Sequence, residues 1–153
     1  MSAQRLPGKP LLEVNGLPII CHVVKKAQET QIGDVIVATE DQEILNQVKK
    51  HKGEAILTSK NPQTGTDRIW EAFKKLNLKN IDYVINLQGD EPLINIEDIK
   101  KLDYLTKKNN CQINTLATNI EDKKLFDSVN TVKVQTEKKL EIEKFSVAQN
   151  FSR

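Results

Sequence analysis

Short apolar runs alternate with longer amphipathic segments over the first two thirds of this chain. The runs are continuous and rich in β-branched residues, which is typical of strands buried on both faces of a parallel sheet. They cover residues 34–38, 54–58 and 83–87. The segments between and after them repeat apolar residues at helical spacing, over residues 18–30, 42–52, 66–76 and 96–105. This alternation predicts an α/β protein with a mostly parallel sheet flanked by helices.

Polar residues at the expected helix starts predict the N-caps. Thr39 and Gln42 have the spacing of a capping box, while Thr66 and Asn95 each precede an apolar helical repeat. Farther along the chain the alternation stops. Two further strands are predicted there, at residues 113–118 and 132–135.

Length and composition predict one soluble domain, or part of one, over residues 1–153. Of the 153 residues, 38% are hydrophobic and 29% are charged, which suits a globular chain with one core. The 23 basic and 21 acidic side chains nearly cancel, so neither nucleic acid nor an anionic membrane is an expected partner. No apolar run approaches the ~20 residues that span a bilayer. Cys21 and Cys111 lack metal-ligand spacing, and we expect a reducing, cytoplasmic location.

A loop rich in cations, glycine and proline opens the chain. Arg5 and Lys9 supply fixed positive charge, and Gly8 lets the backbone approach an anion closely. We expect this loop to hold phosphate oxygens, with Lys9 at the α-phosphate, where charge develops during nucleotidyl transfer. The alternative is a disordered basic N-terminus with a proline-rich turn. The loop does not have the pattern of a P-loop NTPase.

The segment from Gln88 to Pro92 places a carboxylate directly after a predicted buried strand. Asp90 is therefore expected at the carboxyl edge of the sheet, where open α/β sheets bind ligands. A carboxylate there suits Mg²⁺, which proteins usually share with substrate phosphates. The alternative is an ordinary solvated turn.

The loop at residues 62–68 combines small hydroxyl residues, a glycine and an arginine at a helix start. Backbone N–H groups and the planar fork of Arg68 could together bind a base or a ribose. The alternative is helix capping alone, with Thr66 as the cap and Asp67 near the positive end of the helix dipole.

Taken in order, these loops resemble the 3-deoxy-manno-octulosonate cytidylyltransferases, the CMP-Kdo synthetases of lipopolysaccharide biosynthesis. The similarity extends over essentially the whole chain and rests on five collinear motifs, at residues 5–11, 37–39, 64–68, 88–92 and 151–153. It implies a Rossmann-like nucleotidyltransferase fold, of the nucleotide-diphospho-sugar transferase type. It also implies a cytoplasmic, homodimeric enzyme that transfers CMP from CTP to Kdo with Mg²⁺.

The resemblance also implies a role for each matching residue. Arg5, Gly8 and Lys9 would hold the triphosphate, and Arg5, Lys9 and Asp90 would be catalytic, with Asp90 ligating the metal. The nucleotide pocket would be lined by Thr64, Gly65, Thr66, Arg68 and Gln88. Ser152 and Arg153 would lie beside the sugar acid.

Members of this family have a strand ahead of the phosphate loop and continue well beyond the position of Arg153. We therefore expect an incomplete sheet and part of a longer enzyme, without much of the sugar pocket, the dimer contacts and a second metal-binding aspartate. Two alternatives remain open. One is another sugar-acid cytidylyltransferase of the CMP-sialate type, against which the motifs at residues 64–68 and 151–153 argue. The other is a non-catalytic truncated remnant.

Overall fold

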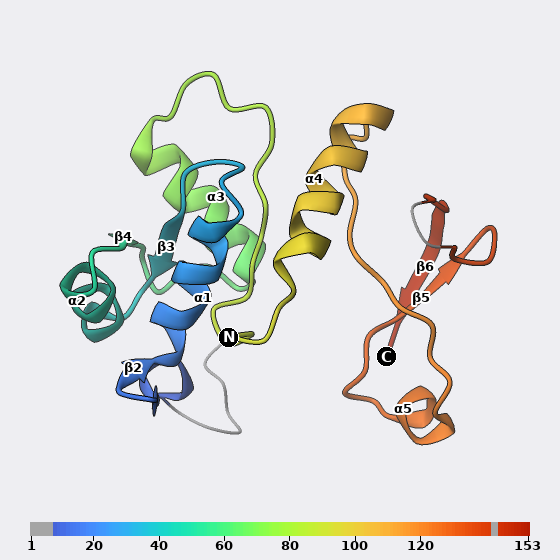
Figure 1. Ribbon diagram of the computed structural model, residues 1–153, viewed down its shortest axis with the longest axis horizontal. Coiled ribbons are helices and arrows are strands. Elements are labelled where there is room, and N and C mark those ends of the chain that lie inside the picture. Colours follow the sequence, from blue (N-terminus) through green and yellow to red (C-terminus); the bar gives the residue numbers. More distant parts are fainter. Residues whose placement is uncertain (1–7, 142–143) are drawn as a thin grey trace. The chain divides into compact units, whose positions relative to one another are not determined.

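The computed structural model describes residues 8–141 and 144–153 of the chain (Figure 1). By its internal contacts the chain forms two compact units, Met1–Glu97 and Asp98–Arg153. That both belong to one domain stays a prediction. In the described residues no helix is both long enough and apolar enough to cross a bilayer.

The first unit is built around a strand–helix–strand motif. Strands β3 (Ile36–Thr39) and β4 (Glu54–Leu57) pair in parallel, with Ile36 opposite Glu54 and Thr39 opposite Leu57. Helix α2 (Gln42–Lys50) connects them, and α1 (Ile19–Glu29) and α3 (Gly65–Leu76) complete the unit. This parallel pair with its connecting helix confirms the predicted alternation for this part of the chain.

A small apolar core joins α1 to α2. Its buried members are Ile20, Cys21, Val24 and Val48, and Leu17, Val35, Val37, Ile44 and Ala55 pack against them. The α1 residues repeat at helical spacing, so burial of one face of this helix explains the amphipathic pattern. This core holds α1 and α2 against strands β3 and β4.

A short hairpin precedes α1. The 3-10 helix η1 (Lys9–Leu11) leads into strands β1 (Glu13–Val14) and β2 (Leu17–Pro18), which pair antiparallel. Asn15 and Gly16 have φ angles of 52° and 73° in the turn between them. Asparagine and glycine tolerate this left-handed conformation, and two such residues in succession suit a tight hairpin turn.

Two of the three predicted N-caps are wrong. Helix α2 is capped by Asp41, whose Oδ1 accepts from the backbone N–H of Glu43 at 2.7 Å, while the Thr39 hydroxyl accepts from the Asp41 N–H. Helix α3 is capped by Thr64 instead of Thr66. In both cases the cap is the polar residue that directly precedes the first helical residue, Gln42 in α2 and Gly65 in α3. The prediction for Asn95 is confirmed, because its Oδ1 accepts from the Glu97 N–H at 2.9 Å.

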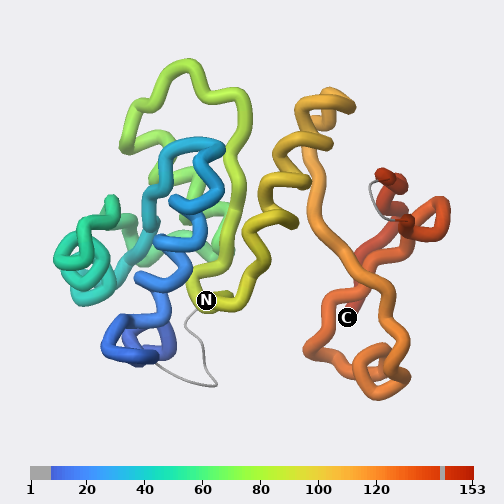
Figure 2. The backbone as a smooth tube through the Cα atoms, viewed as in Figure 1, coloured from blue at the N-terminus to red at the C-terminus, as the bar shows by residue number. Residues whose placement is uncertain are grey.

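The strand predicted at residues 83–87 is not formed. The chain from the end of α3 to the start of α4 has no strand, as the trace in Figure 2 allows the reader to follow, and the Val84 residue is 55% exposed. An apolar run becomes a strand only when a neighbouring strand accepts its backbone hydrogen bonds. No described strand pairs with this segment. The parallel sheet is therefore smaller than predicted.

The second unit contains one long helix and one antiparallel pair. Helix α4 (Ile96–Asn109) enters it and α5 (Lys123–Asp127) follows. Strand β5 (Lys133–Thr136) pairs with β6 (Ala148–Ser152), which confirms the strand predicted at residues 132–135. The strand predicted at residues 113–118 is not formed, and Ile113 is exposed there. As with residues 83–87, no described strand pairs with it.

Candidate functional site

The first and the last of the predicted ligand loops in the first unit are in direct contact. Lys9 Nζ donates to Asp90 Oδ2 at 2.8 Å, across 81 residues of sequence. The side chains of Lys9 and Asp90 are 35% and 45% exposed, so the pair lies at the surface and is open to an incoming ligand. Gly8, which precedes Lys9 and caps η1, has a φ of 75°, a left-handed conformation that glycine adopts without strain.

Close packing of Gly89 on α1 fixes the acidic loop. A Cβ atom added to Gly89 would lie 2.8 Å from Cδ1 of Ile20, which is closer than side chains approach. The absence of a side chain therefore lets α1 reach the loop backbone. The Glu91 N–H donates to the Gln88 carbonyl at 3.3 Å and closes a turn around Gly89 and Asp90. The loop that carries Asp90 is thus positioned by the same helix that forms the core.

The start of α3 lies beside this acidic loop. A Cβ atom added to Gly65 would lie 3.9 Å from Gln88 Nε2. Gln88 Nε2 donates to Asn86 Oδ1 at 3.0 Å. The acidic loop therefore lies beside the positively polarised N-terminus of α3 at Gln88 and contacts the cationic loop at Asp90. Three loops that are far apart in sequence converge here.

A capping box holds the first turn of α3. Thr64 Oγ1 accepts from the Asp67 N–H at 3.1 Å, and Asp67 Oδ2 accepts from the Thr64 N–H at 3.1 Å. Asp67 also places a negative charge at the positive end of the helix. The Thr64 hydroxyl is therefore engaged, whereas the helix start at Gly65 and Thr66 is exposed.

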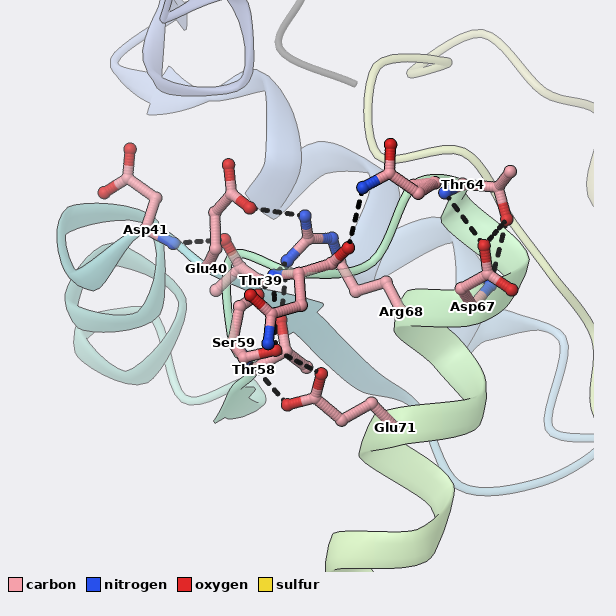
Figure 3. A network of polar contacts seen from close by, with 11 residues as sticks. Thr39, Glu40, Asp41, Thr58, Ser59, Thr64, Asp67, Arg68 and Glu71 are labelled. Atoms are coloured by element: carbon pink, nitrogen blue, oxygen red, sulfur yellow. Dashed lines mark hydrogen bonds and ion pairs between the residues drawn. The ribbon is translucent and has the colours of Figure 1, made fainter.

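The Arg68 guanidinium is bound on both sides by protein groups, as Figure 3 shows. Nη1 donates to Thr58 Oγ1 at 2.6 Å and to the Ser59 carbonyl at 3.2 Å. Nη2 forms an ion pair with Glu40 Oε2 at 2.6 Å. Glu40 follows β3, and Thr58 and Ser59 follow β4. Arg68 therefore ties α3 to the carboxyl ends of both parallel strands.

Glu71, one turn later on α3, binds the same segment. Its carboxylate accepts from the Ser59 N–H at 2.6 Å and from Ser59 Oγ at 2.7 Å (Figure 3). It also pairs with Lys75 at 2.8 Å. The hydrogen bonds from Lys75 and from the Ser59 side chain and backbone stabilise the carboxylate, and they lower the pKa of Glu71 to about 2. Glu71 therefore remains charged in mildly acidic solution.

Three other predicted site residues belong to other parts of the chain. Arg5 is outside the described residues. Ser152 and Arg153 lie at the end of the chain in the second unit, with Ser152 in β6. Sequence reasoning missed Glu40, Thr58, Ser59 and Glu71 as parts of the site framework. Their position in the sequence could have identified three of them, because Glu40, Thr58 and Ser59 lie at or just after the ends of predicted parallel strands, where an α/β sheet positions its ligand loops.

Asp90 fits a divalent cation that arrives with a phosphate ligand. Among the described residues no group of three or more His, Cys, Asp or Glu side chains could hold a metal ion. Mg²⁺ in nucleotide sites is usually bound by one or two carboxylates, substrate phosphates and water. A single half-exposed carboxylate beside a lysine meets that requirement, and it does not meet the requirement of a metal cage built from protein alone.

Comparison with known proteins gives the family. The profile of the cytidylyltransferase family matches residues 1–151. The chain belongs to the cytidylyltransferase family. The profile confirms the cytidylyltransferase family that the five motifs indicated.

Two relatives of this chain within the family carry the same name. A 3-deoxy-manno-octulosonate cytidylyltransferase from Thermodesulfovibrio yellowstonii is 47% identical over 140 residues, which are 88% of this chain and 55% of the relative. A protein of the same name from Nitrobacter winogradskyi is 43% identical over 134 residues, 87% of this chain and 53% of the relative. The chain spans about half the length of the curated relatives it matches.

A solved structure shows the fold. It is CMP:2-keto-3-deoxy-manno-octonic acid synthetase complexed with CTP, and it matches with a TM-score of 0.75 and 31% identity over 97% of this chain and 58% of that chain. The predicted α/β nucleotidyltransferase fold is confirmed, with the sheet only partly formed.

Proposed function

We propose that this chain is the CTP-binding portion of a 3-deoxy-manno-octulosonate cytidylyltransferase, which transfers CMP from CTP to Kdo and releases pyrophosphate. The observation that carries the proposal is the contact between Lys9 and Asp90 at 2.8 Å, because it brings the cationic loop and the acidic loop to one place. The named relatives and the CTP complex of the similar structure support the choice of substrates.

Lys9 is the residue proposed to meet the α-phosphate. The anomeric hydroxyl of the sugar acid attacks the α-phosphorus, the bond to the β-phosphate oxygen breaks, and pyrophosphate leaves. Charge grows on the phosphate oxygens during this step, and a fixed ammonium group stabilises it. Arg5, outside the described residues, is proposed as a second cation. Gly8 keeps the backbone of the loop close to the phosphates.

Asp90 is proposed to hold Mg²⁺ together with the phosphates of CTP. Bound in this way, the metal would neutralise triphosphate charge. In the ligand-free chain Asp90 is paired with Lys9, so binding of CTP requires that the pair separate. Lys9 would then bind a phosphate in place of the carboxylate, and Asp90 would hold the metal in place of the ammonium group. Each group keeps a partner of opposite charge.

The start of α3 and Gln88 are proposed to bind the nucleoside. N–H groups at Gly65 and Thr66 are among those that α-helices leave without intrahelical partners, so they can donate to a ligand. Gln88 offers an amide that can both donate and accept, which suits the edge of a base. Thr64 holds this helix start through its capping box.

The remaining assignments rest on the resemblance. Ser152 and Arg153 are assigned to the sugar acid, since they match the family segment beside that substrate. The complete enzyme is proposed to be a homodimer in the cytoplasm.

The test is release of pyrophosphate from CTP and Mg²⁺ with Kdo, compared with N-acetylneuraminate, using the longest chain that the gene encodes. We expect turnover with Kdo and at least tenfold less with N-acetylneuraminate. The reverse preference would favour a CMP-sialate type of enzyme. Binding of CTP without turnover on either sugar acid would favour a non-catalytic remnant, and no binding of CTP would contradict the proposed function.

A further inference from the structure

We infer that Arg68 is a positioning residue for the nucleotide site: together with Glu40 it holds the start of α3 in place, and it does not itself bind the nucleotide. This inference rests on the proposed function, because it concerns the site where CTP is proposed to bind. It differs from the role that the family resemblance implied for Arg68, which was to line the nucleotide pocket.

The Arg68 guanidinium is occupied by protein oxygens. Its side chain is 15% exposed, and both terminal nitrogens donate to protein oxygens. Nη1 donates to Thr58 Oγ1 and to the Ser59 carbonyl, and Nη2 donates to Glu40 Oε2. A charged fork held by three oxygens at the ends of two strands would have to give up these bonds before it could reach a phosphate.

Ser59 is bound by two side chains of α3. Its N–H and its hydroxyl donate to the Glu71 carboxylate, and its carbonyl accepts from Arg68. All three polar groups of one residue at the end of β4 are therefore bound by side chains of α3. Arg68 and Glu71, three residues apart, lie on the same side of the helix and act on that segment together.

Arg68 lies close to the start of α3. Its N–H donates to the Thr64 carbonyl at 3.1 Å, so Arg68 lies in the first turn beyond the N-cap. Gly65, three residues earlier in the same turn, is the residue that lies beside Gln88. A tie between Arg68 and the strand ends therefore sets where the start of α3 lies beside Gln88, and these are the groups proposed to bind the nucleoside.

The pair of variants Arg68→Lys and Glu40→Gln separates positioning from direct contact. Lysine keeps the charge and loses the fork that reaches both strand ends. Glutamine at residue 40 keeps the shape and removes the charge from the tie, and it leaves Arg68 available to a ligand. Lys74→Ala on the same helix is the control, because Lys74 lies over the Trp70 ring and outside the tie.

Two measurements are made on each variant: the Kd for CTP by calorimetry, and amide hydrogen exchange over residues 59–67 without ligand. We expect both Arg68→Lys and Glu40→Gln to weaken CTP binding by about tenfold, the order expected when one charge-assisted hydrogen bond is lost. Both should speed exchange over residues 59–67, and Lys74→Ala should change neither. In turnover, the KM for CTP should rise, while kcat should stay within about twofold of the wild-type value. The variants weaken binding of the nucleotide, and they remove no group that touches the reacting atoms.

Weaker binding in Arg68→Lys with unchanged binding and exchange in Glu40→Gln would overturn the inference, because that result assigns Arg68 to the ligand. Unchanged CTP binding in both variants would overturn it as well. A wild-type chain that binds no CTP would overturn the proposed function and this inference together. Faster exchange in the two variants would in that case report a tie that serves the fold alone.

Discussion

At the scale of single side chains, the ion pair between Lys9 and Asp90 is better explained by ligand binding than by stability. Exposed ion pairs contribute about 0–1 kcal/mol, since water and salt screen them. Both side chains are more than one third exposed. The pair joins two loops that leave different elements, and those loops present a cation and a carboxylate to solvent.

Replacement of Lys9 should therefore affect the ligand more than the fold. We expect Lys9→Ala to weaken CTP binding by about tenfold or more, since a charge-assisted contact to phosphate is lost. The melting temperature should fall by less than about 3 °C, as for other surface-loop changes. Differential scanning fluorimetry with and without CTP checks both values. Lys49→Ala, on the exposed end of α2, is the matched control. A drop in melting temperature as large as that of a core variant would contradict the surface role of Lys9.

The Glu71 carboxylate gives the structure a defined response to acid. Its pKa in the folded chain is about 2, below the ordinary value of 4.5, because Lys75 and Ser59 bind the charged form. The folded state therefore binds this proton less readily than the unfolded state. The stabilisation is fully present above about pH 4.5, and it is lost as the pH falls toward 2.

An NMR titration of the Glu71 side-chain carboxyl carbon checks this expectation. We expect its midpoint to lie near pH 2, and we expect the Ser59→Ala variant to move the midpoint upward because one hydrogen bond to the carboxylate is removed. A midpoint at 4 or above in the wild-type chain would show that the Ser59 and Lys75 contacts are absent in solution.

Single residues also show what the sequence could and could not predict at the site. Lys9, Asp90 and Gly65 were predicted from loop chemistry and Gln88 from the family resemblance, and the structure brings them together in pairs. The environment of Arg68 was not predictable. Its partners come from segments nine to 28 residues away, and only the pairing of β3 with β4 places them side by side.

At the scale of elements, packing between α1 and α2 holds the first unit together. Val48 is 1% exposed and lies in the cluster with Ile20, Cys21 and Val24. Removal of two buried methyl groups costs their transfer free energy and leaves a cavity. We expect Val48→Ala to lower the free energy of unfolding by about 2 kcal/mol. Urea denaturation measures the change.

Val84→Ala is the matched control for the core variant. Val84 lies in the segment predicted as a buried strand and found exposed. We expect the loss of stability to be below about 0.5 kcal/mol, as for other surface changes. A cost for Val84→Ala equal to that of Val48→Ala would mean that residues 83–87 are buried in solution, and it would contradict the structure of this segment.

The two cysteines report on element packing without any mutation. Cys21 lies in the buried face of α1, and loss of solvation there raises the pKa of its thiol, so little thiolate forms at pH 8. Cys111 follows α4 and is partly exposed. We expect a thiol reagent at pH 8 to modify Cys111 in the native chain and Cys21 only after unfolding. Equal rates for the two thiols, measured by mass spectrometry of the labelled peptides, would contradict the buried face of α1.

The elements that the sequence predicted best are those whose partners are near in sequence. Helix α2 and strands β3 and β4 form a contiguous unit, and their local patterns agree with their packing. The strand at residues 83–87 has the same apolar pattern, yet a strand also needs a neighbour to share its hydrogen bonds. That requirement cannot be read from the residues of the segment itself.

At the scale of the whole chain, the family and the fold were accessible from sequence because five short motifs occur in a fixed order. Each motif alone fits an ordinary turn or cap. Their collinear order over residues 5–153 predicted the cytidylyltransferase family, and the profile match and the solved relative confirm it. The division into two compact units was not predicted, because it depends on contacts between segments and not on local pattern.

The most direct test of the central claim is calorimetric titration of CTP into the wild-type chain and into Asp90→Asn, each with Mg²⁺ and with a chelator. If the two loops form one triphosphate site, the wild-type chain binds CTP more tightly with Mg²⁺. Asp90→Asn should lose that enhancement, while binding without metal should hold or strengthen because Lys9 is released and a repelling carboxylate is removed. An equal response to Mg²⁺ in the two proteins would contradict the account.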